Sequence, residues 1–414
     1  MQKFKHIFAT RSLLYISVFL IPFYFFRFHF GFISTNIFEI AVFAALIAFI
    51  FEQPKKVVDP DYFLATGIFV AVLALGILFA SDKTHAFGIA KGWFLIPAIF
   101  GGLVYKNFDS KNIAKLAVPL IIAIEVVAVW ALFQKTGIVH TLFYQKGDSG
   151  FDQYILQGRA FGPFESPNYL AMFLVPASFF SLLILELGRS RTERMALALT
   201  FVFPLLAIYS SGSRAGAIAT IVAAAIYLNY RFINKRWATV ERPFRRAIFA
   251  AGWIVANIIY LFYALNLVKN PIGGDAVRVE IYKYSIQMLE NVKNFVFGIG
   301  LGDFQAKLAA MSLPDSFRGV GLGYALHPHN LFLAFWLNLG LLGLAGFLYL
   351  ITIFFKNCFE SKSLFRAALI AAMFAILIQG FFDTTYFKND LSAIFWLIFA
   401  GGLILYREKN EKNV

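Results

Sequence analysis

Long apolar segments recur along almost the whole chain, separated by short polar stretches. Each is long enough, or nearly so, to cross the ~30 Å hydrocarbon core of a bilayer as a helix. The predicted spans lie near residues 11–29, 32–51, 63–80, 86–105, 113–133, 167–187, 194–210, 213–232, 246–264, 329–355, 366–382 and 390–406. The pattern predicts an all-α polytopic membrane protein with about twelve transmembrane helices, in which residues 1–414 form a single integral membrane domain.

Two of the connections between the predicted spans are long, residues 134–166 and residues 266–328. The basic, apolar N-terminus lacks a small-x-small cleavage site, so we expect it to be retained as the first helix, with its start inside the cell. Both long loops then fall on the external face, the second of them between helices 9 and 10. Most Lys and Arg residues fall in the predicted cytoplasmic segments, in agreement with the positive-inside rule.

Composition supports this class of protein and limits the others. Of the 414 residues, 60% are hydrophobic and 14% are charged, whereas a soluble domain carries roughly a quarter charged residues. The net charge of +14 comes mainly from Lys and Arg residues in the predicted cytoplasmic segments, where they set the membrane orientation. We therefore expect no nucleic-acid partner. The one cysteine, Cys358, excludes an intramolecular disulfide and a cysteine metal cluster.

The second long loop contains a pattern typical of an amphipathic helix. Apolar residues recur there at helical spacing, at Val277, Ile281, Tyr284, Met288 and Val292. Asp275 is a candidate N-cap. We expect this helix to lie on the outer membrane surface or to cover a cavity, with Arg278 and Lys283 on it, the latter on a solvated face. The following FGIGLGDF is predicted to be a turn, because it lacks the glycine spacing of a nucleotide site.

Three external cations are candidates for holding an anion. Arg159 precedes a Gly/Pro-rich turn in which Ser166 and Pro167 have the pattern of a helix start, and Arg318 lies in the loop that leads to the histidines. Arg214 sits at the edge of a span among Gly and Ala residues. A cation near hydrocarbon costs roughly 2.5–3.5 kcal/mol unless it is paired or reaches the interface, so Arg214 either binds an anion or snorkels.

Two histidines, His327 and His329, stand with Asn330 at the start of the apolar segment near 329–355. An imidazole titrates near neutral pH, which suits a general base that deprotonates a hydroxyl on a membrane-anchored acceptor. A histidine that merely caps the helix or lies at the interface is the alternative. His-x-His is also a weak zinc pattern, and without acidic or cysteine partners nearby we expect no metal.

Three motifs of this chain resemble the O-antigen ligase and polymerase superfamily of bacterial envelope glycan enzymes. The first is His329-Asn330 followed by nine residues and then Gly340-Leu-Leu-Gly343. The second is Ser213-Arg214-Ala215-Gly216 at the start of a span, and the third is Arg159 with the stretch from Gly162 to Asn168. The resemblance covers roughly residues 150–400. The sequence departs from the family pattern at His327, which adds a second imidazole, and at Glu165-Ser166.

The resemblance implies a GT-C-like fold and a metal-independent, inverting glycosyltransferase without a cofactor. The donor would be a glycan on undecaprenyl diphosphate, and the acceptor a hydroxyl of a lipid A core sugar or another glycan. Transfer would occur at the periplasmic, external face of the bacterial inner membrane. His329 would be the base. The diphosphate would be held by guanidinium groups, which match phosphate oxygens, from Arg159, Arg214, Arg278 and Arg318. His327, Asn330, Asn168 and Ser213 would support the site.

Two other functions remain open from the sequence. Within the superfamily, the chain is either a ligase, which the histidine motif favours, or a polymerase or other glycan ligase. A membrane transporter is the alternative from another class, and it would place ionisable residues at mid-membrane. Here the candidate residues cluster at external edges. Glu125 is the main exception, and we interpret it as a buried partner of a polar group.

Overall fold

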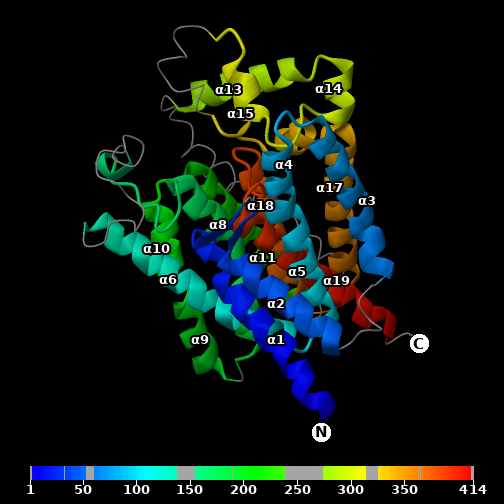
Figure 1. The fold of residues 1–414 in the computed structure, drawn as a ribbon. Helices are drawn as coiled ribbons and strands as arrows, with labels where there is room; N and C mark the ends of the chain where they lie inside the picture. Colours follow the sequence, from blue (N-terminus) through cyan, green and yellow to red (C-terminus); the bar gives the residue numbers. More distant parts are fainter. Residues whose placement is uncertain are drawn as a thin grey trace. The chain divides into compact units, whose positions relative to one another are not determined.

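The computed structural model describes residues 2–31, 33–52, 60–137, 154–188, 190–237, 274–313, 325–361, 363 and 365–411 (Figure 1). The chain divides into two compact units. Unit 1 comprises Met1–Pro119, Ile272–Glu360 and Gly380–Val414, and unit 2 comprises Leu120–Pro271 and Ser361–Gln379. Apart from one short β-hairpin, the regular structure of the described residues is helical. This confirms the all-α prediction.

The hairpin lies in unit 1, where the sequence predicts two consecutive spans near 11–29 and 32–51. Helix α1 (Gln2–Leu20) ends earlier than expected, followed by a short 3₁₀ turn. Strands β1 (Arg27–Phe30) and β2 (Ile33–Asn36) then pair antiparallel before α2 (Ile37–Glu52). The reason lies in the local sequence, because aromatic residues that alternate with polar ones favour a strand and Gly31 adopts the positive φ of a tight turn.

The transmembrane part of unit 1 is built around aromatic side chains. Helix α17 packs on α3 and on α19, and α19 packs on α5. These helices and those that continue into them are α3 (Pro60–Phe79), α4 (Lys83–Ile89), a π-helical turn (Ala90–Leu95), α5 (Ile96–Asn107), α17 (Leu331–Glu360) and α19 (Asn389–Glu411). Neighbouring rings at their contacts are Phe69, Phe94, Phe335, Phe347, Tyr386, Phe395 and Trp396.

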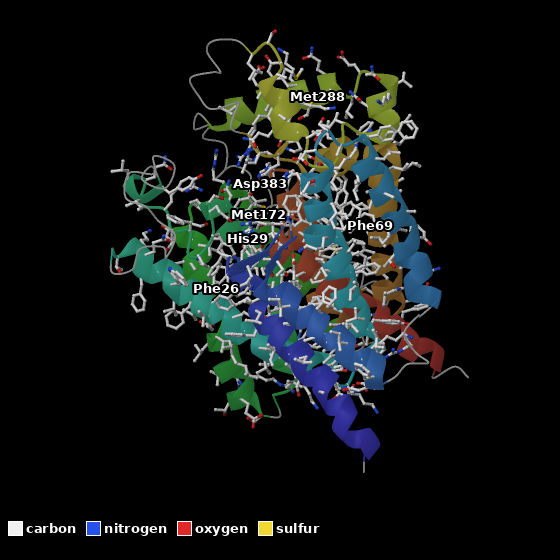
Figure 2. All side chains as sticks on the ribbon, in the orientation of Figure 1. Phe26, His29, Phe69, Met172, Met288 and Asp383 are labelled. Carbon is white, nitrogen blue, oxygen red and sulfur yellow. The ribbon has the colours of Figure 1, made fainter. Side chains whose placement is uncertain are left out.

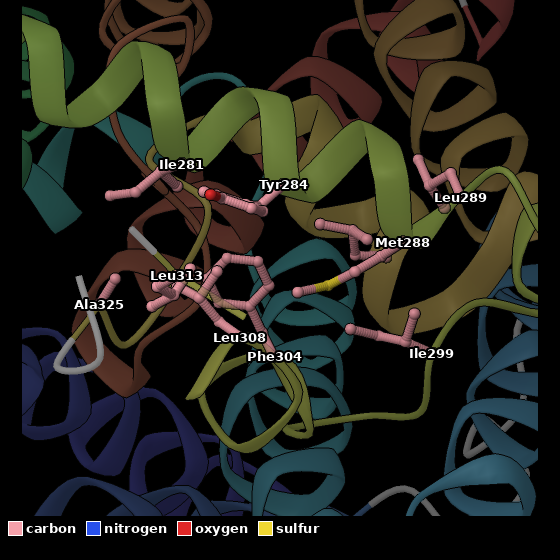
Figure 3. Close-up of a cluster of buried hydrophobic side chains, with 10 residues drawn as sticks. Ile281, Tyr284, Met288, Leu289, Ile299, Phe304, Leu308, Leu313 and Ala325 are labelled. Carbon is pink, nitrogen blue, oxygen red and sulfur yellow. The ribbon is translucent and has the colours of Figure 1, made fainter. Parts of the chain in front are cut away.

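The second long loop folds into three short helices that also belong to unit 1, α13 (Gly274–Met288), α14 (Val292–Phe297) and α15 (Phe304–Ala309). They lie together at the end of unit 1 where α4 begins (Figure 1). Ile281, Tyr284 and Met288 of α13 are buried and point toward the side chains of α15 and the segment after it (Figure 3). The predicted amphipathic helix is therefore confirmed.

Two details of that prediction are wrong. Helix α13 ends at Met288, and Val292 belongs to α14, where it is 78% exposed. Helix α13 begins at Gly274, so Asp275 lies in its first turn rather than before it. Both differences arise at helix ends, which hydrophobic spacing does not locate. Lys283 has 70% of its side chain exposed, as expected.

Glycines allow the α14 segment to lie against α17. The FGIGLGDF stretch is a turn, as predicted, and Gly298, Gly300 and Gly302 all have positive φ. Helix α17 leaves helical geometry at Gly340, where φ is 68°. A Cβ atom at Gly340 would lie 2.1 Å from the Val296 carbonyl oxygen, so no larger residue fits there. The first glycine of the His-Asn-x₉-Gly-x₂-Gly motif therefore has a packing role.

Unit 2 contains the remaining described helices. Helix α11 packs on α8, and a Cβ at Gly216 would lie 2.7 Å from that of Ala171, so the small residues here let the two helices approach closely. The helices of unit 2 are α6 (Ala117–Lys135, from Leu120 onward), α8 (Pro167–Ser181), α9 (Arg191–Leu199), α10 (Val202–Ser210), α11 (Arg214–Trp237) and α18 (Arg366–Gly380, as far as Gln379).

Six helices among the described residues are long and apolar enough to cross a membrane. They are Lys83–Asn107, Ile113–Lys135, Pro167–Leu185, Arg191–Ser210, Leu331–Glu360 and Asn389–Arg407, and three shorter apolar helices accompany them. The protein is thus a multi-pass helical membrane protein. The expected span at 246–264 lies outside the described residues, and the number of twelve stays a prediction.

Candidate functional site

The histidine motif forms the entry to α17 in unit 1. The side-chain oxygen of Asn330 accepts hydrogen bonds from the backbone N–H groups of Phe332 and Leu333, both at 3.0 Å, and so caps the helix. Directly before it, His329 has a φ of 48°, a left-handed conformation adopted by no other non-glycine residue among those described. Such conformations carry strain and are often found at functional sites.

His329 is hydrogen-bonded to a carboxylate that lies far away in the sequence. Its Nδ1 is 3.1 Å from Oδ1 of Asp383, which lies 54 residues further along, in the loop between α18 and α19. The Nδ1 atom of His327 is 3.7 Å from the same oxygen, and the two imidazole rings lie 4.4 Å apart. In Figure 2, Asp383 lies at a level between Met288 and Phe69, all three in unit 1. The Asp383 side chain is only 2% exposed.

The surroundings of Asp383 keep its carboxylate ionised. Burial acts to raise its pKa, but protonated His329, the hydrogen bond from His329, protonated His327 and the charge of Arg278 lower the pKa to about 2, so Asp383 is ionised before either histidine loses its proton. An ionised carboxylate can only accept, so in the neutral form of His329 the proton lies on Nδ1 and the lone pair on Nε2. In this tautomer Nε2 of His329 can accept a hydrogen bond or a proton.

His327 is a much weaker base than an ordinary histidine. Burial lowers its pKa, the charge of His329 lowers it further, Asp383 raises it, and the charges of Lys388 and Arg278 lower it again, to about 3. His327 is therefore neutral at physiological pH and has little tendency to take up a proton. Of the two imidazoles, the structure favours His329 for proton transfer.

Two cations face this group of residues. Arg278, on α13, acts electrostatically on both His327 and Asp383, so the structure brings this predicted residue to the histidines. Lys388 is buried, acts on His327, and has its ammonium group 4.7 Å from the centre of the Tyr24 ring. Lys388 was not expected from the sequence. Arg318 lies outside the described residues.

The same three side chains are of a kind that can hold a metal. One ligand atom each from His327, His329 and Asp383 lie within 4.8 Å of one another, and two histidines with a carboxylate suit a divalent transition metal. A metal at Nδ1 of His329 would have to displace the proton that Asp383 accepts. Nδ1 of His329 can therefore take part in the hydrogen bond to Asp383 or bind a metal, but not both at once.

Because the hydrogen-bonded pair already satisfies both groups, we expect activity to be independent of metal. Purified protein treated with excess EDTA should keep the glycan-transfer activity that the resemblance implies within about twofold of untreated protein. The control is re-addition of Zn²⁺, Mg²⁺ or Mn²⁺ to the treated protein. Activity that is lost with EDTA and returns with one of these ions would contradict the metal-free arrangement.

Unit 2 gathers the other predicted residues at the starts of α8 and α11. The Nε atom of Arg159 donates to the Ser211 carbonyl oxygen at 2.8 Å, and Nη2 donates to Oδ1 of Asn168 at 3.2 Å. Ser166 caps α8 through a 3.2 Å hydrogen bond from the N–H of Tyr169, and Pro167 occupies the first turn, as predicted. The guanidinium group is thus held beside the N-terminus of α8.

The N-terminus of α11 lies next to this guanidinium group. Arg214 is the half-buried first residue of α11, and Oγ of Ser213 accepts a 3.3 Å hydrogen bond from the N–H of Gly216. Gly212 has a φ of 60°, and a Cβ there would lie 3.3 Å from Nε of Arg159. Two helix N-termini with nearby arginines favour the binding of an anion, because their N–H groups and dipoles also attract negative charge.

The structure brings the predicted residues together in two groups. Unit 1 contains His327, His329, Asn330 and Arg278, and unit 2 contains Arg159, Asn168, Ser213 and Arg214. Asp383 is the functional candidate that was missed, although polar residues in FFDTTYFKND between two apolar spans were a usable signal. The expected polar partner of Glu125 is not seen, since its buried Oε1 makes no hydrogen bond with any described residue.

Comparison with known proteins agrees with the motifs. A family model described as O-antigen ligase matches residues 199–348, which include the Ser213-Arg214 motif, α13 and the His329-Asn330 motif. No curated protein matches the chain. The matched segment, together with the multi-pass helical fold, supports the assignment of this chain to the O-antigen ligase and polymerase superfamily, whose members handle glycans at the membrane.

Proposed function

We propose that the protein transfers a glycan from undecaprenyl diphosphate to a hydroxyl of an acceptor such as a lipid A core sugar, at the periplasmic face of the bacterial inner membrane. The observation that carries this proposal is the His329–Asp383 pair, at 3.1 Å, at the start of a membrane-spanning helix. A base at the membrane edge suits an acceptor that is itself held in the membrane.

The proposed reaction needs one proton acceptor and charge neutralisation. Nε2 of His329 takes the proton of the acceptor hydroxyl while the oxygen attacks the anomeric carbon of the donor. The bond from that carbon to the diphosphate breaks, and the diphosphate leaves with the electron pair. Attack from the face opposite the leaving group inverts the anomeric centre. Asp383 stabilises the imidazolium that forms, as a carboxylate does for a histidine base generally.

Each unit, taken by itself, contains arginines suited to bind an anion such as the diphosphate of the donor. Arg159 and Arg214 stand at the helix N-termini of unit 2, and Arg278 stands near the histidine of unit 1. Guanidinium groups bind phosphate oxygens through paired hydrogen bonds and stay protonated while the charge of the leaving group grows. As the resemblance implies, we propose that Arg159, Arg214, Arg278 and Arg318 hold the diphosphate.

The direct test is transfer by purified protein in detergent or nanodiscs. Undecaprenyl-diphosphate-linked glycan and rough lipopolysaccharide, which carries the lipid A core without a glycan, are supplied together, and products are separated by gel and mass spectrometry. A ligase yields glycan-bearing lipopolysaccharide and free undecaprenyl diphosphate. A polymerase instead yields longer lipid-linked chains without lipopolysaccharide, and absence of both products would contradict the proposal.

Substitution of Arg214 by lysine separates charge from geometry. If Arg214 binds diphosphate through its planar fork, lysine keeps the charge but loses paired contacts worth roughly 1.5–3 kcal/mol. Transfer should then fall by about ten- to a hundredfold in the assay above. Arg191→Lys, in the exposed α9 outside the site, is the control and should retain full activity. Full activity of Arg214→Lys would mean that Arg214 only reaches the membrane interface.

A further inference from the structure

One tyrosine connects the two segments that carry the His329–Asp383 pair. The hydroxyl of Tyr282, on α13, lies 2.9 Å from the carbonyl oxygen of His329 and 3.2 Å from that of Phe381, two residues before Asp383. A hydroxyl has one proton, so the proton is shared between the two oxygens in a three-centre hydrogen bond. Tyr282 thus contacts both the backbone of His329 and the backbone just before Asp383.

Asn330 makes a second connection to the same carbonyl group. Its Nδ2 donates to the Phe381 oxygen at 3.3 Å, while its Oδ1 caps α17. The carbonyl of Phe381 is therefore a shared acceptor for Tyr282 and Asn330. Asn330 belongs to the cap of α17, whereas Tyr282 belongs to a different helix, α13. The Tyr282 hydroxyl therefore connects α13 to the segments that carry His329 and Asp383.

The left-handed backbone of His329 explains why such a connection matters. A residue with a φ of 48° is strained and stays in place only when its surroundings hold it. The carbonyl that Tyr282 contacts belongs to this strained residue. A change in its peptide orientation would move the imidazole, and proton transfer between a base and a hydroxyl is sensitive to shifts of about 1 Å.

Helix α13 is well placed to fix Tyr282. Ile281, Tyr284 and Met288 of the same helix are buried in the hydrophobic cluster with Phe304 and Leu308 (Figure 3). Arg278 stands four residues, or about one turn, before Tyr282 and acts on the charge of Asp383. One face of α13 therefore carries both a cation and the tyrosine toward the pair.

We propose that Tyr282 is a positioning residue that sets the geometry of the His329–Asp383 pair and makes it depend on the docking of α13. This role rests on the proposed function of His329 as the base.

The test is Tyr282→Phe, which removes only the hydroxyl. We expect kcat to fall by about ten- to a hundredfold while KM for the lipid-linked donor changes by less than about threefold, because the ring and Arg278 remain. The melting temperature should change by no more than a few degrees, since one hydrogen bond contributes about 1 kcal/mol. Tyr284→Phe is the matched control. Its ring lies in the cluster of the same helix, and kcat should stay unchanged.

A double-mutant cycle separates this role from a general effect on the fold. In the background of Asp383→Asn, where the pair is already broken, Tyr282→Phe should lower kcat by less than about threefold further. Equal losses in both backgrounds, or wild-type kcat in the single variant, would overturn the positioning role. Full activity of His329→Asn would instead overturn the proposed base, so the two failures are distinguishable.

Discussion

Substitution of His329 by alanine is expected to lower glycan transfer by about a hundred- to ten-thousandfold, the range that a positioned general base contributes. The physical reason is that Nε2 of His329 carries the lone pair that takes the proton. The ionised carboxylate of Asp383, whose Oδ1 lies 3.1 Å from Nδ1, holds the ring in the orientation and tautomer that leave this lone pair on Nε2. The measurement is in vitro transfer from the lipid-diphosphate donor, normalised to the amount of folded protein in the membrane. His327→Ala should cost much less, because burial leaves His327 a weak base.

The backbone at this position calls for two further variants. Alanine is strained at a φ of 48°, whereas asparagine and glycine adopt this conformation more readily. His329→Asn should be as inactive as His329→Ala while keeping the melting temperature closer to that of the wild type. In His329→Gly, added imidazole should restore part of the activity by replacing the missing ring. Near-wild-type transfer by His329→Asn would exclude His329 as the base.

Substitution of Asp383 by asparagine is expected to have the second largest effect, also on the order of a hundred- to ten-thousandfold in kcat. The amide keeps the size of the carboxylate but can donate a hydrogen bond to Nδ1. That reverses the tautomer of His329 and places its proton on Nε2, where the lone pair is needed. The charge that stabilises the imidazolium is lost as well. KM for the donor should change little, because Asp383 does not contact it in the proposed mechanism.

A second buried aspartate of unit 1 provides the control. Oδ2 of Asp303 accepts hydrogen bonds from the backbone N–H and the hydroxyl of Ser81, both at 2.7 Å. Asp303→Asn also removes a buried charge, so it should lower the melting temperature without a selective loss of kcat. If both aspartate variants lose activity only in proportion to their loss of folded protein, Asp383 has a structural role and the proposed orientation of His329 fails.

Local patterns in the sequence predict the class of the fold and single out most of the candidate residues. Long apolar segments must enter a bilayer or a core, so their recurrence alone predicts a polytopic helical protein. The spacing of Ile281, Tyr284 and Met288 predicted the buried face of α13, because helix periodicity is a local property. Ser166 and Pro167 marked the start of α8 for the same reason. Short motifs singled out His329, Arg159 and Arg214 as candidates.

Helix ends and the hairpin were less predictable. The sequence predicts spans near 11–29 and 32–51, whereas Arg27–Phe30 forms a strand that pairs with Ile33–Asn36. The apolar residues of this segment are aromatic, and hydrophobicity summed over a window does not separate a membrane helix from an apolar hairpin. Pairing between strands decides the outcome, and it depends on the register of two segments rather than on either alone.

The remaining parts of the candidate site depend on contacts between segments that are far apart in the sequence. Asp383 meets His329 across 54 residues, and Tyr282 reaches the backbone of both segments from a helix in the preceding loop. Neither contact follows from periodicity or spacing, because each depends on how α13, α17 and the loop before α19 pack in three dimensions. The lowered pKa values of Asp383 and His327 have the same origin, since burial and neighbouring charges exist only once the chain has folded.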